Sequence, residues 1–256
     1  MNKVIIIGCP GSGKTTFAQR LGIQLKINPI IRTKEGIEIK AKLNGLKRYV
    51  EEFSNIQNDS IEKFSVMRTL LAVERSDVCL LMIDAVEGVT DQDAKIAGEA
   101  HEAGKGIIIA INKWDEYEKD NNTVEKYKKE VYEKLSYLSY APIIFISAKT
   151  GQRVNKLYEL INIVSNHNAM RISTSVLNQV LNEAVAIVQP PSDKGKRLKV
   201  FYMTQATTKP PTFVIFVNDK KLFHFSYERY IVNQLRKEFI LTGTPIRIIV
   251  REKNEE

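Results

Sequence analysis

Residues 3–15 read Lys-Val-Ile-Ile-Ile-Gly-Cys-Pro-Gly-Ser-Gly-Lys-Thr, and this stretch decides the fold. A short β-branched run ends in a loop that fits the pattern G-x-x-x-x-G-K-[ST], and residues 14–25 have helical character. Backbone N–H groups can curl around a phosphate only where Cβ atoms are absent, which Gly11 and Gly13 permit. The stretch therefore predicts a strand, a phosphate-binding loop and a helix, the alternative being an ordinary glycine-rich turn.

Each residue of this loop receives an expected role. Lys14 neutralises the β- and γ-phosphates and is the catalytic candidate, and the Thr15 hydroxyl binds Mg²⁺. The helix N-terminus adds its dipole toward the anion. The expected phosphate contacts are Gly8, Gly11, Ser12, Gly13, Lys14, Thr15 and Thr16.

Further apolar runs predict a parallel sheet. Residues 78–84, 106–111 and 142–146 have strand length and no polar alternation. Strands of this kind are buried on both faces, with helices covering each side. The intervening helices are expected at residues 91–103, 123–138 and 153–166. Residues 1–168 are thus predicted to form an α/β, doubly wound, mostly parallel P-loop domain.

The pattern changes near His167. Residues 174–188 carry apolar side chains at helical spacing, and strands are expected at 197–204, 212–217 and 245–251. A second helix is expected to begin at a Ser226 cap. Residues 170–256 are thus predicted to form a small α+β domain of order α-β-β-α-β.

Two short motifs predict a guanine site at the ends of strands. Asn112-Lys-Trp-Asp115 follows one strand, and Ser147-Ala148-Lys149 follows the next. A carboxylate at Asp115 can accept hydrogen bonds from N1–H and the amine of guanine, whereas adenine has an acceptor at N1. Asn112 would tie the site to the phosphate loop. Lys113 would lie flat over the purine, and the Ala148 N–H would reach the guanine oxygen, the alternative being a charged loop that caps a strand.

Five segments between about residue 60 and residue 251 carry a family resemblance. They are Ser-Ile-Glu-Lys-Phe-Ser-Val-Met-Arg, Ile-Asn-Lys-Trp-Asp, Tyr-Ala-Pro-Ile-Ile-Phe-Ile-Ser-Ala, Lys-Pro-Pro-Thr-Phe-Val-Ile-Phe-Val-Asn and His-Phe-Ser-Tyr-Glu-Arg-Tyr. These segments closely resemble the Der (EngA) GTPases of bacteria. That resemblance implies a second GTPase domain plus a KH-like domain, without a complete first GTPase domain, and a role in assembly of the large ribosomal subunit. It implies GTP or GDP with Mg²⁺ as ligands.

Residues 1–57 depart from the family pattern. The loop segment Cys9–Ser12 is more similar to that of small-molecule P-loop kinases, and residues 46–53 have helical character. Thr33 is the one threonine between residues 17 and 58, and Asp59 is followed by Ser-Ile-Glu, so no D-x-x-G turn occurs before Asp77. Because GTPases sense the γ-phosphate through such a turn, GTP hydrolysis is expected to be impaired.

The role of Asp84, which ends the run 78–84, stays open between two interpretations. One makes it a Walker-B aspartate that holds Mg²⁺ through water. The family resemblance instead implies a strand residue without a catalytic role.

The formal net charge of +8 is concentrated in the last third, where residues 170–256 hold 14 Lys and Arg against 8 Asp and Glu. A basic small domain favours an RNA partner, here ribosomal RNA. The G-x-x-G loop of RNA-binding KH domains is missing, since Gly195 and Gly243 are the domain's glycines. The cluster Lys194, Lys196, Arg197 and Lys199 is equally compatible with RNA contact and with a solvated strand edge.

Composition excludes other classes. No apolar run reaches the ~18 residues of a membrane span, and the two cysteines and three histidines have no zinc-site spacing. Because the two cysteines also suggest no disulfide framework, a reducing, cytoplasmic location is expected. We expect a guanine-nucleotide-binding protein with no membrane or DNA partner. The alternatives are an ATP-dependent P-loop phosphotransferase and an RNA- or ribosome-binding adaptor that needs no nucleotide.

Overall fold

The computed structural model describes residues 4–9, 11–18, 73–118, 120, 122–193 and 195–253, and the backbone of residues 30–32, 36–38, 41–43 and 46–48. The chain divides into two compact units, Met1–Ser165 and Asn166–Glu256. Each unit is described by itself. Among the described residues, no helix has the length and apolar character that crossing a membrane requires.

The first unit is built on a parallel sheet of four strands, as the sequence predicts. Strands β1 (Val4–Ile7), β6 (Val78–Asp84), β7 (Gly106–Asn112) and β8 (Ile143–Phe145) lie in that order. All three pairings are parallel, and Asp84 pairs with Asn112 at the end of β6 and β7. The carboxyl ends of the strands therefore share one edge of the sheet, where the loops of the candidate site begin.

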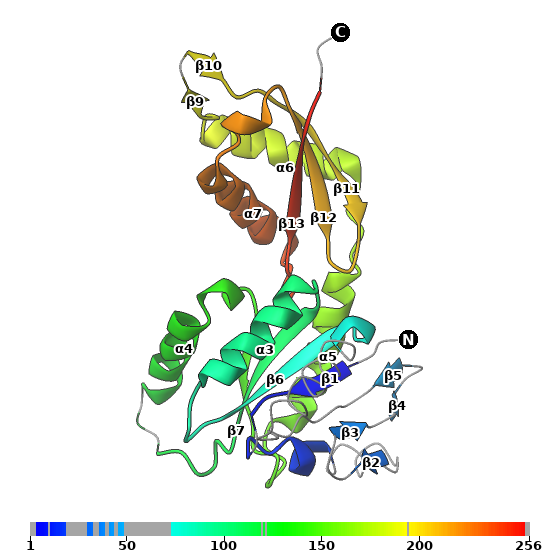
Figure 1. Ribbon diagram of the computed structural model, residues 1–256, viewed down its shortest axis with the longest axis vertical. Coiled ribbons are helices and arrows are strands. Elements are labelled where there is room, and N and C mark those ends of the chain that lie inside the picture. The colour runs from blue at the N-terminus through cyan, green and yellow to red at the C-terminus, as the bar shows by residue number, and fades with distance from the viewer. Residues whose placement is uncertain are drawn as a thin grey trace, which may run out of the picture. The chain divides into compact units, whose positions relative to one another are not determined.

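Helices cover both faces of this sheet (Figure 1). On one face, α3 (Asp91–Glu102) and α4 (Thr123–Lys134) pack on side chains such as Ile83 and Ile109. On the other face, the helical residues 14–18 and α5 (Val154–Asn168) pack on the alternate residues of the same strands, such as Met82 and Ile108. Successive residues of one strand thus enter different cores, which explains why β6 and β7 are apolar without alternation.

Two short hairpins precede β6. Strand β2 (Ile30–Arg32) pairs antiparallel with β3 (Gly36–Glu38), and β4 (Ala41–Leu43) with β5 (Leu46–Arg48). The expectation of a helix from residue 46 is wrong at its start, because residues 46–48 form β5. The dipeptide Asn44-Gly45 between β4 and β5 is a strong hairpin signal that outweighs the helical spacing.

The second unit has the predicted order α-β-β-α-β. Helix α6 (Thr174–Ile187) leads to β11 (Val200–Thr207), β12 (Thr212–Val217), α7 (Phe225–Phe239) and β13 (Arg247–Glu252). The sheet order is β11-β12-β13, antiparallel and then parallel. Both helices pack on the same face of the sheet, where their apolar stripes meet side chains such as Met203, Phe213 and Ile215 (Figure 1).

Two details of the second unit differ from the sequence prediction. Helix α7 is capped by His224, whose side chain accepts from the Ser226 N–H, so Ser226 already lies inside the helix. The basic segment before β11 forms a small ribbon of β9 (Ser192–Asp193) and β10 (Lys196–Arg197). Both residues of β10 are exposed, and Arg197 donates to the Gln189 side chain at 2.9 Å.

Candidate nucleotide site

The phosphate loop turns sharply between β1 and the helical residues 14–18. Gly8, Gly11 and Gly13 have φ of 146°, 83° and 85°, conformations that L-residues rarely adopt. Lys14 is 1% exposed, and its ammonium donates to the Cys9 carbonyl and to Ser12 Oγ. The loop thus encloses a cation in a glycine-rich turn, an arrangement that suits a phosphate group.

Asn112 joins the phosphate loop to the loop after β8. Its Nδ2 donates to the Ser12 carbonyl at 2.8 Å, and its Oδ1 accepts from the Ala148 N–H at 2.8 Å. The side chain is 2% exposed, so water does not compete for these bonds. A Cβ atom at Gly13 would overlap Asn112 Nδ2. Glycine at position 13 is therefore required both for the turn and for the approach of Asn112.

Asp93 fixes the other side of the phosphate loop, a contact that the sequence analysis missed. The carboxylate is 1% exposed and accepts from the Cys9 N–H at 3.1 Å. It also completes a capping box with Thr90 at the start of α3. The motif Thr-x-x-Asp signals the cap, but not the bond to a residue 84 positions away.

Lys113 forms an ion pair with Asp84 across the ends of two strands. Lys113 Nζ lies 2.5 Å from Asp84 Oδ2, and Asp84 Oδ1 accepts from the Val86 N–H at 2.9 Å. The hydrogen bond that Lys113 donates to Asp84 raises the pKa of Lys113, and the negative charge of the carboxylate raises it further. Asp84 is 4% exposed, and the contacts described for its carboxylate are with Lys113 and the Val86 N–H.

The remaining predicted base contacts lie at the same sheet edge. Asp115 is exposed, and Ser147 is buried with its hydroxyl accepting from the Thr150 N–H at 3.1 Å. Lys149 is exposed and 3.5 Å from Glu116. The Ala148 N–H, predicted to reach the guanine oxygen, donates to Asn112 Oδ1 at 2.8 Å in the structure.

The donor set fits a magnesium nucleotide better than a protein-held metal. Among the described residues, no group of three or more His, Cys, Asp or Glu side chains could hold a metal ion. Thr15 is half-buried at the start of the helical residues, and Thr16 beside it is exposed. Mg²⁺ commonly binds through one or two protein oxygens together with substrate phosphates and water. Thr15 stays the predicted protein ligand for that arrangement.

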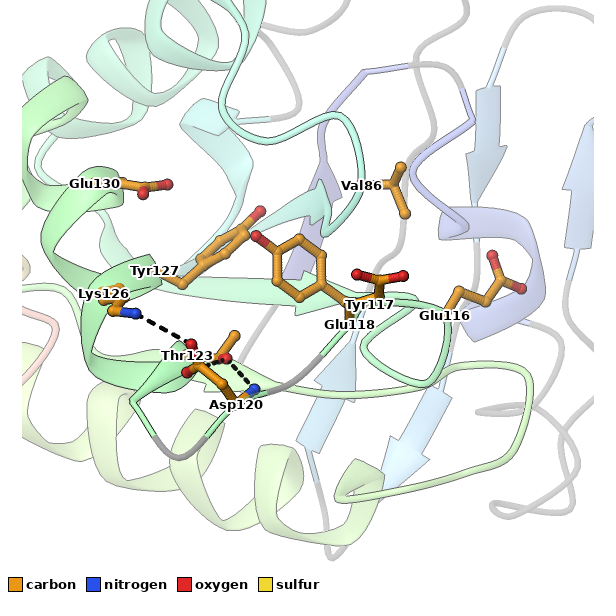
Figure 2. Close-up of a pocket in the computed structure, with 9 residues that line it drawn as sticks. All are labelled: Val86, Glu116, Tyr117, Glu118, Asp120, Thr123, Lys126, Tyr127 and Glu130. Atoms are coloured by element: carbon orange, nitrogen blue, oxygen red, sulfur yellow. Dashed lines mark hydrogen bonds and ion pairs between the residues drawn. The ribbon is translucent and has the colours of Figure 1, made fainter.

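A separate cavity of about 610 Å³ lies between the loop after β7 and the start of α4. None of the predicted site residues lines it. Figure 2 shows Tyr117 and Tyr127 side by side within a ring of carboxylates, one of which, Asp120, is bonded to Lys126 and Thr123. Because acids outnumber cations, this cavity is unfavourable for phosphate. Its lining residues are Val86, Glu116, Tyr117, Glu118, Asp120, Thr123, Lys126, Tyr127 and Glu130.

The expected departures in the switch regions lie outside the described residues. Thr33 and Asp59, with the sequence that follows Asp59, belong to the segments that the structure leaves undescribed. The absence of D-x-x-G before Asp77 is a property of the sequence alone.

Family profiles together match residues 3–167 and 171–251. A profile described as "50S ribosome-binding GTPase" matches residues 3–113, and one for the GTP-binding domain of elongation factor Tu matches residues 62–167. A third, described as "KH-domain-like of EngA bacterial GTPase enzymes, C-terminal", matches residues 171–251.

Curated relatives extend the likeness beyond the segments that sequence analysis identified. GTPase Der of Ruminiclostridium cellulolyticum is 52% identical over 265 residues, and GTPase Der of Alkaliphilus oremlandii is 54% identical over 260 residues. The alignments cover 99% and 98% of this chain, so the likeness includes most of residues 1–57. The chain spans 59% of the length of each relative.

Solved structures show the fold. Era of Aquifex aeolicus, bound to GDP and aluminium fluoride, is 18% identical with a TM-score of 0.50, over 98% of this chain and 92% of its own. Elongation factor SelB of Methanococcus maripaludis is 23% identical with a TM-score of 0.51, over 67% of this chain and 36% of its own. These structures share the fold of this chain, and the profiles and the relatives confirm the resemblance of this chain to the Der (EngA) GTPase family.

Proposed function

We propose that this chain binds GTP and GDP with Mg²⁺, with the phosphates in the glycine-rich loop and guanine against the segments that contain Asp115 and Ala148. The observation that carries this proposal is the pair of hydrogen bonds from Asn112, which connect the phosphate loop to both base-binding segments. One nucleotide can therefore span from Lys14 to Asp115, with its charge at the buried cation and its base at the exposed carboxylate.

The chain's own residues would divide the work as follows. Lys14 and the loop N–H groups bind the phosphates, and Thr15 supplies an oxygen to Mg²⁺, which balances phosphate charge when bound. Asp115 accepts the two guanine N–H groups. Since Ala148 donates to Asn112 in the structure, guanine oxygen recognition requires that this bond lengthen or be shared. Lys14 is the group that contacts the reacting phosphate.

We further propose that hydrolysis of GTP is slow. The catalytic water and the γ-phosphate are normally positioned by the switch segments, and this sequence has no D-x-x-G turn between the phosphate loop and Asp77. Nucleotide binding does not depend on that turn. Single-turnover hydrolysis compared with GTP affinity, for the wild type and Lys14→Ala, tests the two properties separately.

The second unit supports a ribosomal partner, with ribosomal RNA as the contacted component. Its profile is that of the KH-like EngA domain, one profile of the first unit is described as 50S ribosome-binding, and residues 170–256 carry an excess of six positive charges. We propose a role in assembly of the large subunit on these grounds. Co-sedimentation with isolated large subunits at low and high salt, with GTP, GDP or no nucleotide, tests it. Binding that ignores nucleotide would favour the adaptor alternative.

Isothermal titration with GDP and ADP tests the nucleotide assignment. We expect GDP to bind more tightly than ADP, and Asp115→Ala to remove that preference while leaving the phosphate loop unchanged. Tighter binding of ADP by the wild type would support the phosphotransferase alternative. Unchanged GDP affinity in Asp115→Ala would show that guanine is not bound at that carboxylate.

A further inference from the structure

The sequence leaves two roles open for Asp84, a Mg²⁺ ligand or a strand residue without a function in the site. Its ion pair with Lys113 supports a third role. We propose that Asp84 is a positioning residue, whose buried carboxylate anchors the Lys113 ammonium so that the Lys113 alkyl chain forms a fixed platform for the purine. This inference rests on the proposed guanine site and assigns a specific residue to its construction.

The pairing of β6 and β7 brings the two side chains together. Asp84 and Asn112 are partners in the parallel register, so Lys113 follows directly beside the end of β6. Ala85 N–H donates to the Asn112 carbonyl at 2.9 Å and continues the pairing past the last residue of β6. Asp84 can therefore reach Lys113 without any movement of either strand.

Lys113 is held in a backbone conformation that a lysine does not favour. Its φ is 59°, in the left-handed region, which is unfavourable for a residue with a Cβ atom. Such conformations persist when surrounding contacts determine them, and they concentrate at functional sites. Here the next residue, Trp114, is 3% exposed and donates its N–H to the Ile146 carbonyl at 3.1 Å. The side chain of Lys113 is 35% exposed while its partner is 4% exposed, so the ammonium end is anchored and part of the side chain faces solvent.

The backbone at Asp84 and Ala85 is hydrogen-bonded to a buried tyrosine of α4. Tyr127 of α4 is 5% exposed, and its hydroxyl lies 3.1 Å from the Ala85 carbonyl and 3.4 Å from the Asp84 carbonyl. Tyr127 also packs edge-to-face on Trp114, with ring centroids 5.5 Å apart. The carboxylate is thus fixed by its own backbone and by Val86, and a carboxylate fixed in this way can hold a flexible lysine in one rotamer.

A double-mutant cycle tests the proposal. Asp84→Asn keeps the size of the side chain and the bond from Val86, but removes the charge that holds Lys113. Lys113→Met keeps an unbranched, largely apolar side chain without the ammonium. We expect each variant to weaken GDP binding roughly tenfold, and the double variant to bind no more weakly than the weaker single variant. Binding of inorganic pyrophosphate, which requires only the phosphate loop, should be unchanged in all three.

The controls separate a positioning role from loss of structure. The single tryptophan, Trp114, reports whether the first unit is folded in each variant. The NMR titration of Lys113 Cε should move to lower pH in Asp84→Asn, which tests whether the ion pair forms in solution, while a loss of GDP binding with unchanged pyrophosphate binding separates positioning from a purely structural role. Additive losses in the cycle, or an Asp84→Asn variant with wild-type GDP affinity, would overturn the proposal. A folded wild-type protein that binds pyrophosphate but not GDP would instead overturn the proposed guanine site.

Discussion

Replacement of Gly13 by alanine, compared with the same change at Gly11, isolates the tie between the phosphate loop and Asn112. The two glycines have almost the same φ, 85° at Gly13 and 83° at Gly11. Apart from its chain neighbours, a Cβ at Gly11 would have no atom of the described residues within 4 Å, whereas a Cβ at Gly13 would overlap Asn112 Nδ2. Gly11→Ala is therefore a matched control for the backbone strain.

The expected difference follows from the contacts that only one variant loses. Both alanines must adopt a positive φ, at a cost of about 1–2 kcal/mol. Gly13→Ala also displaces Asn112, whose amide is buried and bonded to Ser12 and Ala148. Leaving a buried polar group unpaired costs about 1–3 kcal/mol. Gly13→Ala should thus lower the free energy of unfolding by that further amount.

Urea unfolding without nucleotide, followed by the fluorescence of Trp114, measures this difference in the first unit alone, because the chain has no other tryptophan. The m-values should be equal, so that the midpoints can be compared. Equal destabilisation by the two variants would show that the hydrogen bonds of Asn112 do not depend on the space at Gly13, and would refute the predicted difference.

Four further predictions address other contacts. Asp93→Ala should destabilise the first unit by about 1–3 kcal/mol in the same unfolding assay, because it leaves the Cys9 N–H and the start of α3 without their hydrogen-bond partner. Asp91→Ala, at an exposed position of the same turn, is the control and should lower the free energy of unfolding by less. Thr123→Val should raise the pKa of Asp120, because the hydrogen bond from Thr123, followed by those from the Asn122 N–H and Lys126, lowers that pKa to about 2. The stabilisation from this bond is present above pH 3.8 and is lost as the pH falls toward 2. A ¹³C titration of the Asp120 carboxyl measures the shift, and an unchanged pKa in Thr123→Val would contradict the bond. The Cys79 thiol, whose pKa burial raises to about 12, should react with a thiol reagent at pH 8 only when the first unit unfolds; rapid labelling of Cys79 in folded Cys9→Ser protein would contradict its burial. Gln205→Leu removes side-chain bonds to Ile172 N–H and the Met170 carbonyl, so it should lower the second unit's thermal midpoint in circular dichroism without shifting the Trp114 transition; a matching shift in Trp114 would argue against separate units.

The sheet and the ends of its strands could be predicted because local signals determine them. The continuous apolar runs of β6 and β7 need cover on both faces, and the glycine pattern after β1 needs a phosphate-type turn. The residues after β7 and β8 then had to meet at one edge of the sheet, which placed Asn112 near Ala148. The strand β5 was missed because helical spacing was weighed above the hairpin signal of Asn44-Gly45.

The partners of buried charges could not be predicted. Asp93 reads in the sequence as a helix cap, and its bond to the Cys9 N–H exists only because α3 packs beside the phosphate loop. Asp84 and Lys113 are 29 positions apart, and their pairing depends on the register of two strands. The bond from the Ala148 N–H to Asn112 Oδ1 likewise depends on how the loops after β7 and β8 lie in space, which the sequence does not give.

Binding of xanthosine diphosphate is the measurement that tests most directly whether one nucleotide spans from Lys14 to Asp115. Xanthine has a carbonyl where guanine has its amine, so Asp115→Asn can donate to that oxygen and still accept from N1–H. By isothermal titration, Asp115→Asn should lose affinity for guanosine diphosphate and gain affinity for xanthosine diphosphate. Parallel changes for the two nucleotides, or none, would contradict the assignment of Asp115 to the base.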